Sequence, residues 1–165
     1  DMGCRVTVLP GVPTIFSVMQ SSLEKAPLVF PDVRLVTNTA AALHPSMLPT
    51  LGRLFPNARI FKMYGLTECK RVSFLDPDLL ARHPDSVGTA LAGTSVSLHT
   101  PEGEQVAPGE TGILHIQGPH VMMGYWNKPE TNKKIFREID GKRFFLTGDI
   151  AHFDEDGFLT ITDRK

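Results

Sequence analysis

The chain has 165 residues, of which 41% are hydrophobic and 21% are charged, a composition typical of a globular protein with its own core. Its 17 basic and 18 acidic residues give a formal net charge of -1, which argues against nucleic acid as a partner. No apolar run is long enough to predict a transmembrane segment. Cys4 and Cys69 show no CxxC spacing, so we interpret them as reduced thiols of a cytoplasmic protein.

The first 85 residues alternate between predicted strands and predicted helices. Strands are predicted over 5–9, 33–36 and 59–63, and helices are predicted to begin at Pro13 and Pro45. Pro10 and Gly11 are expected to end the first strand. This order predicts a parallel β-α-β layer of the α/β class, in which ligands bind beyond the carboxyl ends of the strands.

From about residue 85 the pattern changes to short strands separated by turns. Strands are predicted over 96–98, 112–117, 143–147 and 158–162. Asp140-Gly141 predicts a hairpin between the segment 133–139 and the strand that follows. We therefore expect two domains, residues 1–85 as the α/β part and residues 86–165 as a small distorted antiparallel β-barrel.

A run of chemically active residues, MYGLTECKR, follows the third predicted strand. Tyr64 offers a flat face on which a base can stack, and Gly65 lets a ligand approach the backbone closely. Thr67 can donate a hydrogen bond to a phosphate oxygen, and Glu68 is a hard oxygen ligand for Mg²⁺. The alternative is that these are ordinary turn residues at the end of a strand.

Two further residues near the end of the chain suit the same kind of ligand. Asp149 follows Thr147-Gly148, predicted as a tight turn, and a carboxylate there can accept two hydrogen bonds from a ribose diol. Arg164 can contact ribose or phosphate with two hydrogen bonds. Alternatively, Asp149 stabilises a turn and Arg164 is a solvated charge.

Other common sites are not supported by the sequence. Asp154-Glu155-Asp156-Gly157 lacks the earlier aspartate and the later glutamate of a calcium loop, so a hairpin turn is favoured. The six histidines show no metal-ligand spacing. There is no Walker-type phosphate loop, no GxGxxG and no Gly-x-Ser-x-Gly.

Taken in order, the motifs resemble those of the adenylate-forming superfamily, which includes acyl-CoA synthetases and peptide-synthetase adenylation domains. Tyr64–Glu68 is similar to its Tyr-Gly-x-Thr-Glu motif and Thr147–Asp149 to its Thr-Gly-Asp. Residues 124–131, GYWNKPET, are similar to its Gly-Tyr-x-x-x-Pro-x-x-Thr stretch, and residues 163–165 to the start of its hinge motif. The resemblance implies a fragment of a larger adenylating domain, lacking an upstream phosphate loop and a mobile C-terminal domain.

The resemblance also implies an activity and its nucleotide site. Members activate a carboxylic acid with ATP and Mg²⁺ to an acyl-adenylate, and most transfer the acyl group to coenzyme A. By comparison, Tyr64 packs against adenine, with Gly65 beside it, and Thr67 contacts the α-phosphate. Glu68 helps to hold Mg²⁺, and Asp149 holds the ribose hydroxyls of ATP or AMP.

The remaining site residues follow from the same comparison. Arg164 contacts ribose or phosphate, and Ile161 lies near the nucleotide, although a plain core position is equally compatible with its sequence context. Thr39, Ala40 and Met63 border the acyl pocket.

The sequence departs from the family pattern at two places. Residues 39–42, TAAA, stand where many members have Gly-Gly-Ala-Pro, which changes the expected shape of the acyl pocket. Lys70 and Arg71 can face phosphates, an anionic part of the substrate, or water.

Three functions therefore stay open at this point. The first is an AMP-forming acyl-CoA synthetase, of which the isolated 165-residue segment is expected to be inactive. The second is an adenylation domain that loads a carrier-protein thiol, and the third is a nucleotide-binding homologue without chemistry. The sequence does not name the carboxylic acid.

Overall fold

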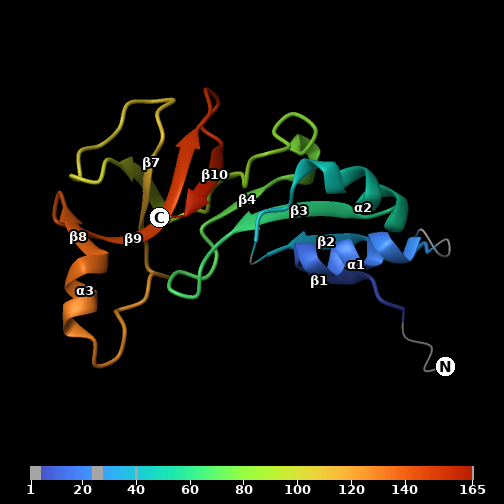
Figure 1. Ribbon diagram of the computed structural model, residues 1–165, viewed down its shortest axis with the longest axis horizontal. Helices are drawn as coiled ribbons and strands as arrows, with labels where there is room; N and C mark the ends of the chain where they lie inside the picture. Colours follow the sequence, from blue (N-terminus) through green and yellow to red (C-terminus); the bar gives the residue numbers. More distant parts are fainter. Residues whose placement is uncertain (1–4, 24–27, 40, 165) are drawn as a thin grey trace. The chain divides into compact units, whose positions relative to one another are not determined.

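The computed structural model describes residues 5–23, 28–39 and 41–164, and the chain divides into two compact units (Figure 1). Unit 1 contains Asp1–Met63 and Leu75–Asp85, and unit 2 contains Tyr64–Phe74 and Ser86–Lys165. Residues 64–74, which the sequence analysis placed in the first part, thus pack with the second half of the chain. Consequently the segment that follows the third strand belongs to unit 2.

Unit 1 is built on a parallel sheet, as the alternation of strands and helices predicts. Its elements are β1 (Val8–Gly11), α1 (Pro13–Leu23), β2 (Leu35–Asn38), η1 (Pro45–Met47), α2 (Leu48–Leu54), β3 (Arg59–Tyr64) and η2 (Pro77–Leu79). β2 pairs in parallel with both β1 and β3. One hydrophobic cluster joins both long helices to the sheet, with Phe16 from α1, Val36 from β2 and Leu51 from α2 fully buried.

The first strand does not end where the sequence analysis expected. β1 includes Pro10 and Gly11, which were predicted to break it. β1 is the edge strand and, among the described residues, pairs only with β2. Because no described strand lies on its other side, the missing N–H of Pro10 leaves no hydrogen bond to a second neighbouring strand unmade. The position in the sheet therefore overrides the breaker residues.

Unit 2 carries an antiparallel sheet. Its elements are β4 (Ser73–Leu75), whose last residue belongs to unit 1, and β5 (Thr89–Ala90), β6 (Ser95–His99), β7 (Gly112–Gln117), α3 (Pro129–Ile135), β8 (Phe136–Ile139), β9 (Lys142–Phe153) and β10 (Leu159–Arg164). The strand order is β10-β9-β7-β6, with β8 paired to β9, and β4 pairs separately with β5. In the described part of the chain no pairing joins β6 to β10, so the predicted barrel is an open sheet. The Asp140-Gly141 hairpin between β8 and β9 is confirmed, with positive φ at both residues.

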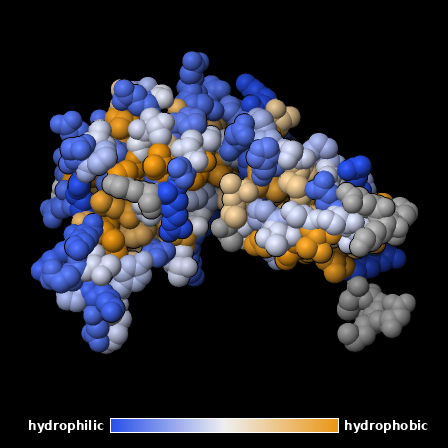
Figure 2. Space-filling view, in the orientation of Figure 1, coloured by the Kyte–Doolittle hydropathy of each residue, from blue (hydrophilic) through white to orange (hydrophobic). Residues whose placement is uncertain are grey.

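The sequence analysis missed helix α3. Of its seven residues, PETNKKI, only Ile135 is apolar, so no amphipathic period marks it. Its Lys133 and Glu130 form an exposed ion pair at 2.9 Å, and the surface around α3 is hydrophilic (Figures 1 and 2). Within the described ranges, no helix is long and apolar enough to cross a membrane.

A pair of histidines is buried beside the core of unit 2. The rings of His99 and His115 lie 4.3 Å apart, and His115 is only 1% exposed. Nδ1 of His115 lies 2.9 Å from the carbonyl oxygen of Ile113, whereas its Nε2 has no partner among the described residues. The pKa of His115 is lowered to about 4, chiefly by burial; the nearby His99 and Arg137 also lower it, whereas the hydrogen bond to the Ile113 carbonyl acts in the opposite direction.

This histidine predicts a pH-dependent stability. Between about pH 6.5 and 4 the unfolded chain binds a proton at His115 that the folded chain excludes, so the free energy of unfolding falls as the pH falls through this window. The loss is on the order of 3 kcal/mol at its limit. His115→Gln, which cannot titrate, is expected to lose less stability between pH 7 and pH 4.5 in urea denaturation followed by circular dichroism. An equal loss in both proteins would show that other groups cause the acid sensitivity.

Candidate functional site

Four segments of unit 2 bring predicted site residues together. The hydroxyl of Tyr64, at the end of β3, donates a hydrogen bond to Oδ2 of Asp149 in β9. Nε of Arg164, the last residue of β10, lies 3.4 Å from Oδ1 of the same carboxylate. The hydroxyl of Tyr125, in the loop after β7, donates to Oε1 of Glu68. The structure thus assembles two carboxylates, each held by a tyrosine.

Asp149 is the most buried charge of this cluster, with 5% of its surface exposed. A buried carboxylate is costly without partners, and Tyr64 and Arg164 supply a donor and a positive charge. Burial, followed by the hydrogen bond to Asp149, raises the pKa of Tyr64 far above its ordinary value, so the phenol stays protonated and remains a donor. The Arg164 side chain is 70% exposed, which leaves it free to turn toward a ligand.

A bulge in β9 directs Asp149 into the cluster. Three residues of β9, Thr147–Asp149, lie opposite a single residue of β7, Leu114. Gly148 has a φ of 77°, a conformation that a residue with a side chain rarely adopts. The Thr147 hydroxyl donates to the Leu114 carbonyl at 3.0 Å and accepts from the Asp149 N–H at 3.0 Å. The predicted tight turn at Thr147–Asp149 is therefore a bulge inside one continuous strand.

Gly65 is required by a close approach of backbone. A Cβ built at Gly65 would lie 1.6 Å from the carbonyl oxygen of Lys70 and 2.7 Å from its carbonyl carbon. The loop closes through a hydrogen bond from the Val72 N–H to the Tyr64 carbonyl at 2.9 Å. Lys70 itself has a φ of 47°. The absence of a side chain at Gly65 thus admits the loop's own backbone, and a close approach of a ligand there stays a prediction.

Glu68 lies at the edge of this loop. Its side chain is half-buried, and its backbone carbonyl accepts a hydrogen bond from the Met122 N–H at 2.7 Å. Neighbouring Thr67 is exposed. Among the described residues no three His, Cys, Asp or Glu side chains gather as a metal cage. One carboxylate fits Mg²⁺ nonetheless, because this ion is commonly held by one or two carboxylates together with substrate phosphates.

The other predicted site residues lie elsewhere. Thr39 and Met63 belong to unit 1, where both are half-buried, and Ala40 lies outside the described residues. Ile161 packs against the hydrophobic core of unit 2, so its core role is shown and a contact to nucleotide stays a prediction. Lys70 and Arg71 are both exposed.

Sequence reasoning gave no role to Tyr125 and missed Asn132. Counting along the Gly-Tyr-x-x-x-Pro-x-x-Thr stretch from Gly124, the last position falls on Asn132 and not on Thr131, which the sequence analysis had matched. Asn132 hydrogen-bonds both backbone groups of Tyr125, at 2.8 and 2.9 Å. The spacing itself was the clue that could have identified Asn132.

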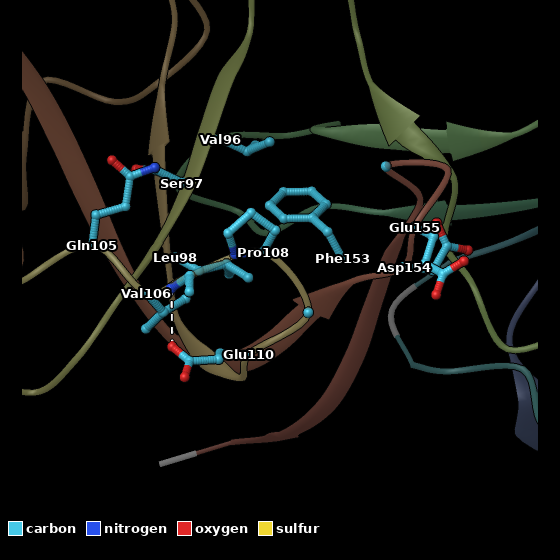
Figure 3. A pocket seen from close by; sticks show the side chains of 13 residues that line it. Val96, Ser97, Leu98, Gln105, Val106, Pro108, Glu110, Phe153, Asp154 and Glu155 are labelled. Atoms are coloured by element: carbon cyan, nitrogen blue, oxygen red, sulfur yellow. Dashed lines mark hydrogen bonds between the residues drawn. The ribbon is translucent and has the colours of Figure 1, made fainter.

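A separate pocket of about 330 Å³ lies elsewhere in unit 2 (Figure 3). Its apolar lining includes Val96, Val106 and Phe153, and two acidic residues, Glu110 and Asp154, also line the pocket. None of the predicted site residues lines it. The pocket is therefore distinct from the carboxylate–tyrosine cluster.

Comparison with known proteins shows the family to which the chain belongs. A family model described as AMP-binding enzyme matches residues 3–126, about three quarters of the chain. The chain belongs to the AMP-binding enzyme family. Among curated relatives, a long-chain-fatty-acid–CoA ligase of Salmonella typhimurium is 35% identical over 159 residues, which are 96% of this chain and 28% of that protein. The chain thus spans little more than a quarter of the length of such relatives.

Solved structures of other proteins share the fold of this chain. VinN has a TM-score of 0.83 and 41% identity over 95% of this chain and 39% of its own, and it has also been solved with L-aspartate. FadD1, a long-chain-fatty-acid–CoA ligase of Archaeoglobus fulgidus, has a TM-score of 0.87 and 26% identity over 96% of this chain and 34% of its own. These matches confirm an α/β fragment of an adenylating domain.

The close approach at Gly65 gives a direct test of the loop. Gly65→Ala places a methyl group on the Lys70 carbonyl, so we expect the chain to lose about 1–3 kcal/mol of stability, as overpacking typically costs. Gly52→Ala in α2 is the matched control, because no atom lies within 4 Å of its Cβ position. That control is expected to gain up to about 1 kcal/mol from helix propensity. Equal urea midpoints for Gly65→Ala and the parent would contradict the described loop.

Proposed function

We propose that this chain forms the nucleotide-contacting part of an AMP-forming acyl-CoA synthetase. The observation that carries the proposal is the buried Asp149 carboxylate, held by Tyr64 and Arg164, in a member of the AMP-binding enzyme family. Because the chain spans 28% of curated CoA ligases, the activity belongs to the complete gene product that contains it.

Asp149 is proposed to hold the ribose. The Tyr64 hydroxyl fixes Oδ2 of Asp149. The distance of 3.4 Å between Nε of Arg164 and Oδ1 of Asp149 is longer than that of a strong charge-assisted hydrogen bond. Ribose hydroxyls can therefore take the place of Arg164 at Oδ1, and the exposed guanidinium can turn to a phosphate. The ring of Tyr64 packs against the base. This exchange needs only one side chain to move.

The reaction that follows is acyl adenylation. A carboxylate oxygen of the acid attacks the α-phosphorus of ATP, and pyrophosphate leaves; a thiol then displaces AMP. Thr67 and Glu68 lie on the same loop, where they can contact phosphate and hold Mg²⁺. The ion, when bound, neutralises charge on the phosphates. For comparison, the O-succinylbenzoate–CoA synthetase of Bacillus subtilis, 26% identical, has been solved in complex with ATP and magnesium.

The acid is proposed to be a fatty acid and the acceptor coenzyme A, because several curated relatives are long-chain-fatty-acid–CoA ligases from different bacteria. The proposal places the protein in the cytoplasm, where ATP and coenzyme A are available. Thr39, Ala40 and Met63 are proposed to border the acyl chain.

A second candidate is adenylation of a small polar amino acid, with transfer to a carrier-protein thiol or to coenzyme A. VinN, solved with L-aspartate, is 41% identical to this chain, more than the 35% of the Salmonella ligase. Lys70 and Arg71 are exposed beside Glu68, where two cations can pair with a second carboxylate of the acid. An apolar acid gives these cations no partner.

ATP–pyrophosphate exchange by the complete gene product tests both candidates. The panel contains acetate, octanoate, palmitate, benzoate and L-aspartate. We expect exchange to be stimulated by the fatty acids, and stimulation by L-aspartate alone would establish the second candidate. A folded protein that exchanges with no acid would be a nucleotide-binding homologue without chemistry.

Removal of the Asp149 carboxylate should weaken nucleotide binding. Asp149→Ala and Asp149→Asn are expected to raise the KM for ATP by about 10- to 100-fold, the usual effect of losing charged hydrogen bonds. Glu102→Gln is the control, because it neutralises an exposed carboxylate at a turn of the same unit. An unchanged KM in both Asp149 variants would remove this residue from the nucleotide site.

A further inference from the structure

In the loop after β7, Met122, Met123 and Tyr125 are each held by hydrogen bonds, and Gly124 fits closely against Asn132. Met122 donates its N–H to the Glu68 carbonyl at 2.7 Å. The Met123 carbonyl accepts from Nη2 of Arg143 at 2.6 Å, and the Arg143 guanidinium stacks on a phenylalanine ring. Gly124 has a φ of 146°, and a Cβ there would lie 2.8 Å from the Asn132 amide. This degree of fixation is unusual for an exposed loop.

Asn132 holds the last residue of this segment. Its Oδ1 accepts from the Tyr125 N–H at 2.8 Å, and its Nδ2 donates to the Tyr125 carbonyl at 2.9 Å. The amide side chain therefore makes the pair of bonds that a neighbouring β-strand would make. Since Asn132 lies in α3, the helix anchors the loop directly.

Hydrophobic burial accounts for only one end of this loop. Met122 packs against the core of unit 2, whereas the side chains of Met123 and Trp126 are 92% and 89% exposed. Tyr125, between them, turns its hydroxyl to Glu68. The anchors thus fix the position of one phenol relative to one carboxylate.

We propose that Tyr125 and Asn132 are positioning residues for Glu68: Asn132 fixes the Tyr125 backbone, and the Tyr125 hydroxyl fixes Oε1 of Glu68 so that Oε2 faces the magnesium–ATP complex. The inference rests on the proposed function, because it takes Glu68 as the ligand of Mg²⁺. It goes further by assigning the geometry of that ligand to two residues outside the Tyr64–Glu68 run.

A phenol suits this role better than a cation. It orients the carboxylate without cancelling the negative charge that attracts Mg²⁺. The Tyr125 hydroxyl donates a hydrogen bond to Oε1 of Glu68 in this arrangement. The chain has two tyrosines, and each donates to one of the two carboxylates of the site.

The test measures ATP binding by isothermal titration calorimetry without any acid, once with Mg²⁺ and once with EDTA. The complete gene product is compared with its Tyr125→Phe, Asn132→Ala and Glu68→Gln variants. The measured quantity is the ratio of the two dissociation constants, which reports how much Mg²⁺ tightens binding. Trp126→Ala is the matched control, since it removes an exposed side chain next to Tyr125.

We expect Glu68→Gln to abolish the magnesium-dependent gain and Tyr125→Phe and Asn132→Ala to reduce it by about tenfold, as for residues that orient a metal ligand. Binding in EDTA should stay unchanged, and Trp126→Ala should behave as the parent. In the double variant Glu68→Gln with Tyr125→Phe, the second change should have no further effect.

Three results would overturn the inference in distinguishable ways. A full magnesium gain in Tyr125→Phe, with the gain lost in Glu68→Gln, would remove the positioning role and leave the proposed function intact. Weaker binding of Tyr125→Phe in EDTA as well would make Tyr125 a direct contact or a structural residue. A full gain in Glu68→Gln would show that the magnesium assignment itself is wrong.

Discussion

The buried carboxylate of Asp149 is the constraint on which the rest of unit 2 depends. A charge that is 5% exposed needs partners, and those partners come from segments far apart in sequence. Tyr64 lies 85 positions before it, and Arg164 lies on the next strand. Satisfying this one group therefore ties Tyr64 to the sheet of unit 2, and the fully buried Cys69 and Val72 add hydrophobic contacts between residues 64–74 and the core of the same unit.

The same constraint explains the shape of β9. In a regular strand, Asp149 would be placed by simple alternation of side chains between the two faces of the sheet. The bulge at Thr147–Asp149 breaks that alternation, and Gly148 makes it sterically possible. Thr147 then stabilises the irregular backbone through its hydroxyl. Backbone geometry thus accounts for Gly148 and Thr147 before any ligand is considered.

The sequence predicted those parts of the fold that local interactions determine, and it missed those that depend on tertiary contacts. The parallel layer and the hairpin at Asp140-Gly141 follow from periodicity and turn chemistry, and both are confirmed. The continuation of the first predicted strand through Pro10 and Gly11 was missed because edge position, a tertiary property, decides it. The Tyr125–Glu68 contact joins residues 57 positions apart, and no local pattern predicts such a pair. Family resemblance supplied the site residues, but not the contacts among them.

Asp149 and Glu68 each accept a hydrogen bond from a tyrosine, but they differ in whether a cation lies nearby. Each is oriented by a neutral phenol, which fixes one oxygen and preserves the negative charge. Asp149 also has the exposed cation Arg164, whose Nε lies 3.4 Å from its second oxygen, and the proposed function has ribose hydroxyls take that place. Glu68 pairs with no such cation among the described residues, which suits the role of magnesium ligand proposed for it.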